Sequence, residues 1–225
     1  MPLYGLNSSV DLVAGYSDVN SGVVQGLFNV SGSGTIFGAK WNYYLPKFAS
    51  IDQKLSLGLD YRAFKNNVTL AGVGLVPDIT IRPATLAYSG SYRGASSDLT
   101  FNASVSANIP GGNDGGSADF ARSRASATDH YVIYRAGASY QMSFAQDWQA
   151  RASVAGQYTR DALVSGELFG LGGPDNLRGF LVREVNNDRG ASGQLELYTP
   201  ELAPKVGLPD KFRMRGLTGF LCQVH

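Results

Sequence analysis

The residues best suited to specific chemistry lie in one glycine-rich segment in the second half of the chain. Glycine has no Cβ and lets a loop turn tightly. Arginine presents a planar fork of donors that holds a carboxylate through two hydrogen bonds, a geometry that lysine lacks. We therefore predict that the segment's arginine binds a carboxylate, with an ordinary exposed turn as the alternative. The segment contains Gly172, Gly173, Leu177, Arg178, Gly179 and Phe180.

Further charged residues stand in two other settings. The run Asp188-Arg189-Gly190 follows the glycine-rich segment and precedes a stretch of alternating apolar and polar residues. Single charges also stand between apolar residues in other alternating stretches, where they occupy the polar positions. These are Lys54, Asp60, Arg62, Arg135 and Arg151.

The spacing of reactive residues favours neither an enzyme nor a metal site. His130 and His225 are far apart, and neither has a cysteine or a pair of carboxylates at ligand spacing. The sequence contains no Gly-x-Ser-x-Gly motif, and residues 170–173 lack the strand, loop and helix context of a phosphate-binding loop. We therefore expect no catalysis, no metal, no cofactor and no small-molecule substrate.

Composition excludes further classes of protein. Charged residues make up 16% of the chain, against roughly 25% in an ordinary soluble domain. The net charge of +1 argues against a nucleic-acid partner, which would call for a clustered basic excess. The single cysteine, Cys222, excludes an intramolecular disulfide. No stretch reaches the roughly 18 apolar residues of a membrane-spanning helix.

The segments that must position the charged residues alternate with a period of two. From position 55 the odd residues Leu55, Leu57, Leu59 and Tyr61 are apolar, with polar or small residues between them. The same pattern recurs over 99–109, 132–142 and 148–158. Because strand side chains point to opposite faces in turn, each segment predicts a strand with one apolar and one polar face.

The lengths of these strands favour a membrane barrel. They are about ten residues or more, whereas globular strands usually have about 5–6 and membrane strands need about 9–11. Aromatic residues such as Trp148 and Tyr158 stand at strand ends on the apolar face, as in an interfacial girdle. The predicted strands are 8–16, 22–30, 35–45, 53–63, 79–92, 98–109, 130–142, 147–159, 188–199 and 212–222.

The connections support the same interpretation. Those near 17–21, 46–52, 93–97 and 143–146 are short, whereas those near 64–78, 110–129 and 160–187 are long. A short joint at 31–34 falls on the side of the long ones. Short periplasmic turns and long extracellular loops are typical of outer-membrane barrels. The predicted fold is an all-β, antiparallel transmembrane β-barrel of about ten strands, forming one domain over 1–225, and the alternative is a soluble antiparallel barrel or sandwich.

Residues 166–200 carry a resemblance to a known family. The segments concerned are Leu171-Gly172-Gly173, Leu177-Arg178-Gly179-Phe180, Asn187-Asp188-Arg189-Gly190 and the strand Gln194–Tyr198 followed by Thr199-Pro200. They resemble the hemolysin secretion/activation family, the outer-membrane barrel transporters of two-partner secretion. The resemblance implies that this chain is part of a larger barrel of about sixteen strands, incomplete at both ends, and that it lacks the preceding periplasmic targeting domains.

The same resemblance assigns a role to the glycine-rich loop. In the family, the loop corresponding to 160–187 folds back into the barrel, and its arginine, here Arg178, meets an acidic residue on the inner wall. The position expected for that acid holds Cys222, a neutral thiol that cannot pair with a guanidinium. Because the pattern breaks so close to the end, we expect a truncated or frameshifted reading frame. The first residues do not form a signal peptide, which also indicates a fragment.

The function implied by the resemblance is export of a hemolysin-like or adhesin-like exoprotein across the bacterial outer membrane. Its partners would be that exoprotein and the lipid bilayer, and the charges on the polar faces would line the conduit or simply be solvated. Three alternatives remain open: a barrel-assembly insertase, a passive porin, and a non-functional truncated transporter.

Overall fold

The computed structural model describes residues 2–3, 6–24, 28–66, 69–70, 73–74, 77–144, 147–172, 184–202 and 215–224. Almost all of its regular structure is extended. The strands are β1 (Pro2–Leu3), β2 (Ser8–Val24), β3 (Phe28–Phe48), β4 (Ile51–Asn66), β5 (Thr69–Leu70), β6 (Val73–Gly74), β7 (Ile79–Ile81), β8 (Pro83–Arg93), β9 (Ser97–Asn108), β10 (Val132–Phe144), β11 (Trp148–Tyr158), β12 (Phe169–Leu171), β13 (Val185–Asn187), β14 (Gly190–Tyr198) and β15 (Leu217–Val224). Two short helical segments, α1 (Ser117–Ser123) and the 3-10 turn η2 (Ser165–Glu167), interrupt them.

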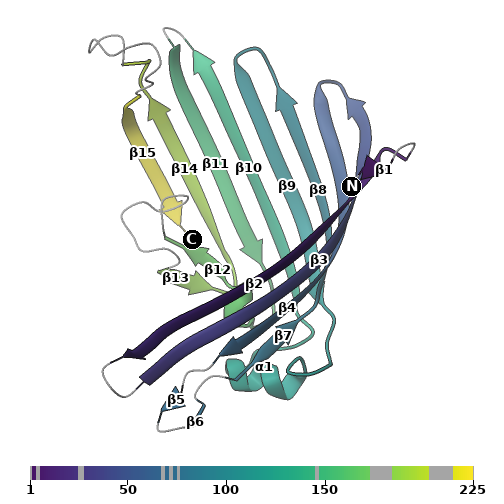
Figure 1. Cartoon of the computed structure of the whole chain (residues 1–225). Helices are drawn as coiled ribbons and strands as arrows, with labels where there is room; N and C mark the ends of the chain where they lie inside the picture. The colour runs from purple at the N-terminus through teal and green to yellow at the C-terminus, as the bar shows by residue number, and fades with distance from the viewer. Residues whose placement is uncertain are drawn as a thin grey trace.

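One antiparallel sheet dominates the structure. Its strands follow the order β1-β2-β3-β4-β8-β9-β10-β11-β14-β15, so that consecutive long strands are neighbours (Figure 1). β5, β6 and β7 pair beside this path, and β12 and β13 form a separate two-stranded sheet. Within the described residues the sheet is curved and open, with β1 and β15 at its two edges. The all-β antiparallel prediction is confirmed.

The two faces of the sheet differ as the alternation predicts. On β4, Leu57 and Leu59 are 50% and 55% exposed, whereas Ser56, the residue before Leu57, is only 4% exposed. Tyr61 on the same strand, Tyr134 on β10 and Leu195 on β14 are exposed large side chains as well. Since strands pair with matching faces, these residues form one continuous apolar outer face, and the polar positions form the inner face.

The predicted strands at the N-terminal end are wrong in number. We expected three strands over 8–45, but β2 and β3 form a single long hairpin in which residues 17–21 and 31–34 are strand rather than turn. Both stretches are rich in Ser, Gly, Asn and Asp, the residue types that favour turns, and their local sequence therefore resembles that of a turn. Pairing between β2 and β3 continues through them, for example at Ser17↔Gly34, and satisfies their backbone in the extended form.

Two further predictions differ in detail. The expected strand 79–92 is divided at Arg82 into β7 and β8, and the Arg82 backbone amide donates to Asn108 Oδ1 at 2.7 Å instead of continuing the ladder. The expected loop 110–129 contains α1, whose only buried side chain is Phe120. Tertiary packing of that one ring compensates for a helix too short to be stable alone.

The two ends of the sheet carry different connections. β3–β4, β8–β9 and β10–β11 are joined by short turns at one end, and β4–β8, β9–β10 and β11–β14 by long loops at the other. An exception is the connection from Thr199 to Gly216 between β14 and β15, which is long but lies at the short-turn end. No helix among the described residues is long and apolar enough to cross a bilayer.

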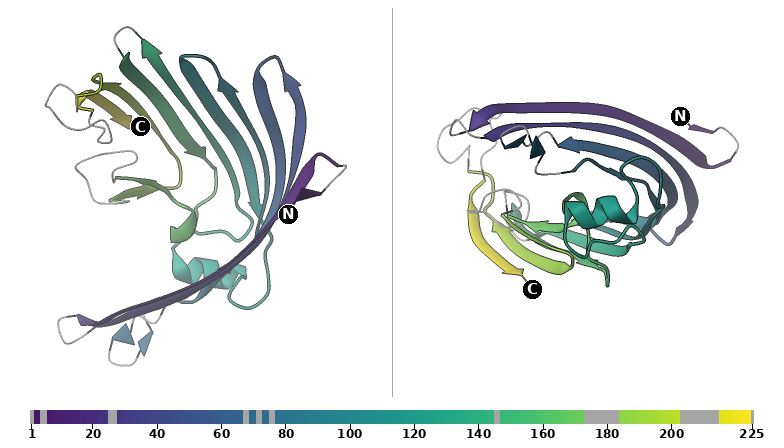
Figure 2. Two further views of the ribbon diagram at one scale, coloured as in Figure 1. Left: turned by 45° about the horizontal axis from the view of Figure 1, so that its top comes forward. Right: turned by 90° about the horizontal axis from the view of Figure 1, so that it is seen from below.

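The buried core lies on the inner side of the sheet at the long-loop end. Seen from below, α1 sits inside the curve of the sheet (Figure 2). Its Phe120 is fully buried with Tyr131, 6.3 Å away between ring centroids. The remaining core residues come from β7, from the segment between α1 and β10, from the start of β10 and from the segment after β11: Ile79, Ile81, Ala127, Ile133, Leu163 and Val164. We call α1 and residues 159–171, which contribute to this core from inside the sheet, the inner plug.

Candidate functional site

A buried carboxylate, Glu167, forms the centre of the candidate site. It is the last residue of η2, and η2 begins directly after Leu163 and Val164. These two side chains are 0% and 2% exposed in the core. Burying these two apolar side chains brings the chain back inside the sheet after β11 ends. Gly166 lies against the ring of Phe64 on β4, so the turn reaches the inner wall closely. Glu167 is thereby placed 2% exposed among the polar inner residues of the sheet.

Glu167 joins two strands that are not neighbours. Its Oε1 accepts a hydrogen bond from Arg62 Nη1 of β4 at 2.9 Å, and its Oε2 accepts one from Arg135 Nη2 of β10 at 2.7 Å. β8 and β9 stand between these strands in the sheet. A carboxylate with each oxygen on a different guanidinium is well compensated for its burial. The glutamate therefore ties the inner plug to two separate points on the wall.

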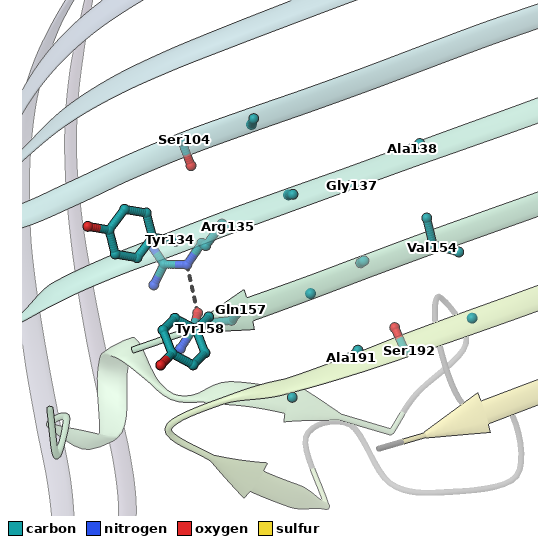
Figure 3. A pocket seen from close by; sticks show the side chains of 16 residues that line it. Ser104, Tyr134, Arg135, Gly137, Ala138, Val154, Gln157, Tyr158, Ala191 and Ser192 are labelled. Atoms are coloured by element: carbon teal, nitrogen blue, oxygen red, sulfur yellow. Dashed lines mark hydrogen bonds between the residues drawn. The ribbon is translucent and has the colours of Figure 1, made fainter. Parts of the chain in front are cut away.

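Neighbouring side chains hold the two arginines in place. Asp60 Oδ2 accepts from Arg62 Nη2 at 2.6 Å. Gln157 of β11 accepts from Arg135 Nε at 2.7 Å, as the dashed line in Figure 3 shows, and its own amide nitrogen donates to the Glu167 carbonyl at 2.9 Å. We call Asp60, Arg62, Arg135, Gln157 and Glu167 the Glu167 cluster.

Asp60 depends on a glycine on the adjacent strand. Gly38 of β3 stands opposite Asp60 in the register. A Cβ at Gly38 would lie 2.7 Å from Asp60 Oδ1, closer than such atoms approach in proteins. The absence of a side chain at this position thus makes room for the carboxylate that supports Arg62.

A second ion pair fixes the other side of the inner plug. Arg124, just after α1, donates through Nη2 to Asp188 Oδ2 at 3.0 Å and through Nη1 to the Leu163 carbonyl at 2.7 Å. Asp188 Oδ1 also accepts the Leu163 backbone amide at 2.8 Å. The hydrogen bond from Arg124 holds the pKa of Asp188 below its usual range. Asp188, predicted as a supporting motif residue, therefore joins the β9–β10 connection, through Arg124, to two parts of the β11–β14 connection.

Tyr131 lies between the core and the Glu167 cluster. Its ring is fully buried, and burial followed by the charge of Glu167 raises its pKa above the ordinary tyrosine value. Its hydroxyl has no hydrogen-bond partner among the described residues. The hydroxyl is therefore neutral and contributes packing without pairing.

The other predicted conduit charges lie apart from the Glu167 cluster. Arg151 of β11 places Nη1 3.9 Å from Oε2 of Glu196 on β14, and Tyr198 also donates to that oxygen at 2.9 Å. Lys54 lies on the inner positions of β4 toward the short-turn end, opposite Ser89. Arg189 is exposed directly before β14 and precedes Gly190, which pairs with Gln157.

Most of the glycine-rich motif lies outside the described residues. This applies to Gly173, Leu177, Arg178, Gly179 and Phe180. Gly172 is described, and its φ of 113° lies in a region that side-chain-bearing residues rarely adopt. Cys222 stands in β15 opposite Gln194 of β14.

Sequence reasoning missed the residues that organise the site, Glu167, Gln157 and Arg124. The signal available was indirect: Arg62 and Arg135 occupy polar strand positions, and no register partner of either arginine on the adjacent strands is acidic. In the described part of the chain, no three of His, Cys, Asp and Glu gather as a metal site would require.

Comparisons with known proteins identify relatives of this arrangement. The family model described as "Haemolysin secretion/activation protein ShlB/FhaC/HecB" matches residues 7–211. Among solved structures, CdiB from Escherichia coli is 18% identical with a TM-score of 0.71, covering 85% of this chain and 36% of its own. CdiB from Acinetobacter baumannii is 15% identical with a TM-score of 0.64, covering 84% and 34%. This chain thus spans about a third of the length of these structures, whose likeness shows the fold. The search of curated proteins found no match.

Proposed function

This chain belongs to the hemolysin secretion/activation family (ShlB/FhaC/HecB), and we propose that it forms part of the barrel of a two-partner secretion transporter. The barrel would stand in the bacterial outer membrane and pass a partner exoprotein, hemolysin-like or adhesin-like, in an extended form. The transport step breaks no covalent bond, so the protein's contribution is a path and a gate.

The two faces of the sheet support this proposal. The apolar outer face, with Leu57, Leu59 and Leu195 about half exposed, suits contact with lipid. The inner wall carries small polar side chains, as Ser56, Ser106 and Ser192 illustrate. Such a wall hydrogen-bonds weakly to any passing backbone and lets an extended chain slide without a specific binding site.

The Glu167 cluster is the observation that carries the proposal of a gated path. A passive pore has no need for a loop that enters the conduit and ties itself to two strands of the wall. Here the inner plug occupies the long-loop end and is held by Arg62 and Arg135 through one buried carboxylate. We assign this state to the resting transporter, and passage of the exoprotein requires these two contacts to be released.

The glycine-rich loop would continue the same plug deeper into the barrel. Arg178 would bind a carboxylate on the inner wall, as predicted from its resemblance to the family. With Cys222 at the expected acidic position, the carboxylate would come from another residue. Glu196 is an inner-wall acid on the strand next to β15 and is 2% exposed, which makes it the first position to test by charge reversal.

A secretion assay tests the function. The gene for the transporter that contains this chain is deleted, and the deletion is complemented with the wild type, with Arg178→Ala, or with Arg93→Ala as a control. Arg93 is an exposed arginine at the opposite, short-turn end of the sheet. We expect the exoprotein to reach the medium with the wild type and the control, and to remain in the periplasm in the deletion strain.

The outcomes separate the two levels of the proposal. Exoprotein secretion that is unaffected by the deletion would show that this protein is not the transporter. Secretion restored equally by Arg178→Ala and by the wild type would be consistent with the transporter function but would contradict the role proposed for the glycine-rich loop. Appearance of the protein in the outer-membrane fraction, extracted only by detergent, checks its location independently.

A further inference from the structure

The outer face of the sheet carries a depression near the long-loop end. It has a volume of about 920 Å3 and is lined by β9, β10, β11 and β14. Its floor is a row of small residues that pair directly across the four strands, Ala103↔Ala136, Ala136↔Gly156 and Gly156↔Ala191. Because each member of the row has at most a methyl group, the sheet surface recedes there between larger neighbours.

Aromatic rings border this depression toward the loops. Tyr134 and Tyr158 are register partners. Each lies two residues from a member of the row of small residues, on the same face of its strand, and both are about half exposed. Figure 3 shows them at the same end of β10 and β11. In a barrel, tyrosines at this level mark the boundary between the acyl chains and the headgroups. The depression therefore lies just inside the hydrocarbon layer.

Two arginines stand beyond the tyrosines. Arg160 follows β11 and donates through Nε to the Tyr158 hydroxyl at 3.4 Å, and Arg189 precedes β14. The charges of both act on Tyr158. Among the residues that the structure describes, no carboxylate forms a salt bridge with either arginine, and the nearby Asp188 is occupied by Arg124. Two exposed positive charges thus face the headgroup level.

We infer that this surface binds a phosphorylated glycolipid of the lipid A type, with an acyl chain in the depression and a phosphate between Arg160 and Arg189. The long-loop end faces the cell exterior if the proposed function holds, and there the outer leaflet supplies such a lipid. The charges match an anionic headgroup, the tyrosines match the interface, and the small-residue row matches a chain. A zwitterionic phospholipid offers the chain without the net negative headgroup.

Lipid binding by the detergent-purified transporter tests the inference. Dissociation constants are measured in mixed micelles for lipid A and for dephosphorylated lipid A. The first variant, Arg160→Gln with Arg189→Gln, removes the headgroup contacts. Its control, Lys47→Gln with Arg93→Gln, removes two exposed charges at the short-turn end. The second variant, Gly156→Leu, fills the depression; a Cβ there meets its nearest atom at an ordinary 3.5 Å.

We expect the wild type and the control to prefer phosphorylated lipid A by about tenfold or more. The double arginine variant should lose that preference, and Gly156→Leu should weaken both lipids. Equal affinity of the double arginine variant and the wild type for lipid A would overturn the inference. Displacement of lipid A by inorganic phosphate at equal concentration would also overturn it, since the site would then hold only an anion. Either failure, in a protein that still fractionates with the outer membrane, leaves the proposed function intact.

Discussion

Replacing Glu167 by glutamine is expected to loosen the inner plug. The substitution keeps the side chain's size but removes the charge that compensates Arg62 and Arg135. Removing one partner of a fully buried ion pair costs about 3–5 kcal/mol. Here the side chains of Arg62 and Arg135 are 31% and 36% exposed and keep Asp60 and Gln157 as partners, so solvent reduces the loss.

We therefore expect the free energy required to open the plug to fall by about 2 kcal/mol. This corresponds to a roughly 30-fold rise in the population of the open plug. The rise is measurable as thiol accessibility at Val164→Cys, a position that is 2% exposed in the core, with the native cysteine removed by Cys222→Ser. When opening and closing are fast, the labelling rate follows the open population.

The assay is carried out on intact cells that carry the whole transporter, with a maleimide as the label. Glu184→Gln is the matched control, because Glu184 is an exposed glutamate on the same connection between β11 and β14. We expect labelling in Glu167→Gln to be about 30-fold faster than in the parent, and labelling in the control to be unchanged. A rate within about threefold of the parent would refute the view that Glu167 holds the plug closed.

Three further substitutions or conditions test other contacts. Because Arg124 lowers the pKa of Asp188, the stabilisation by this pair is complete above the ordinary aspartate pKa of about 4 and is lost as the pH falls from there through the lowered pKa; thermal unfolding from pH 7 to pH 3 should show the decline. Tyr131→Phe should leave the unfolding free energy unchanged or raise it by up to about 1 kcal/mol, since the hydroxyl is buried without a partner in the described structure. Gly38→Ala should cost about 1 kcal/mol in denaturant unfolding, because its Cβ displaces the Asp60 carboxylate.

Each of these has an internal control. Asp188→Asn should remove its share of the pH dependence, and an unchanged pH profile in that variant would contradict the assignment. A clear loss of stability in Tyr131→Phe would mean that the hydroxyl has a partner. Gly34→Ala on the same strand as Gly38 meets its nearest side-chain atom at an ordinary 3.6 Å, so an equal cost at both glycines would disprove the specific role of Asp60.

Much of the fold could be predicted from local periodicity. Residues 55–61 alternate between apolar and polar, and β4 indeed exposes Leu57 and Leu59 while it buries Ser56. Alternation is a property of a few neighbouring residues, so a strand and its two faces can be predicted from it without knowledge of the rest of the chain. The predicted turn at 17–21 was wrong because pairing with β3 holds these turn-forming residues in the extended form. Local propensity does not include the partner strand.

The sequence by itself determined the two-faced strands, the unequal connections and, through Leu177-Arg178-Gly179-Phe180 and its flanks, the family that the comparison confirmed. Only the tertiary structure decided that Glu167 meets both Arg62, far before it in the chain, and Arg135. The reason is physical: each residue's face follows from a period of two, but its partner across the conduit depends on the register and curvature of every strand between. The glycine-rich loop marks the family, and within the described residues the contacts between the inner plug and the two arginines centre on Glu167, which precedes that loop.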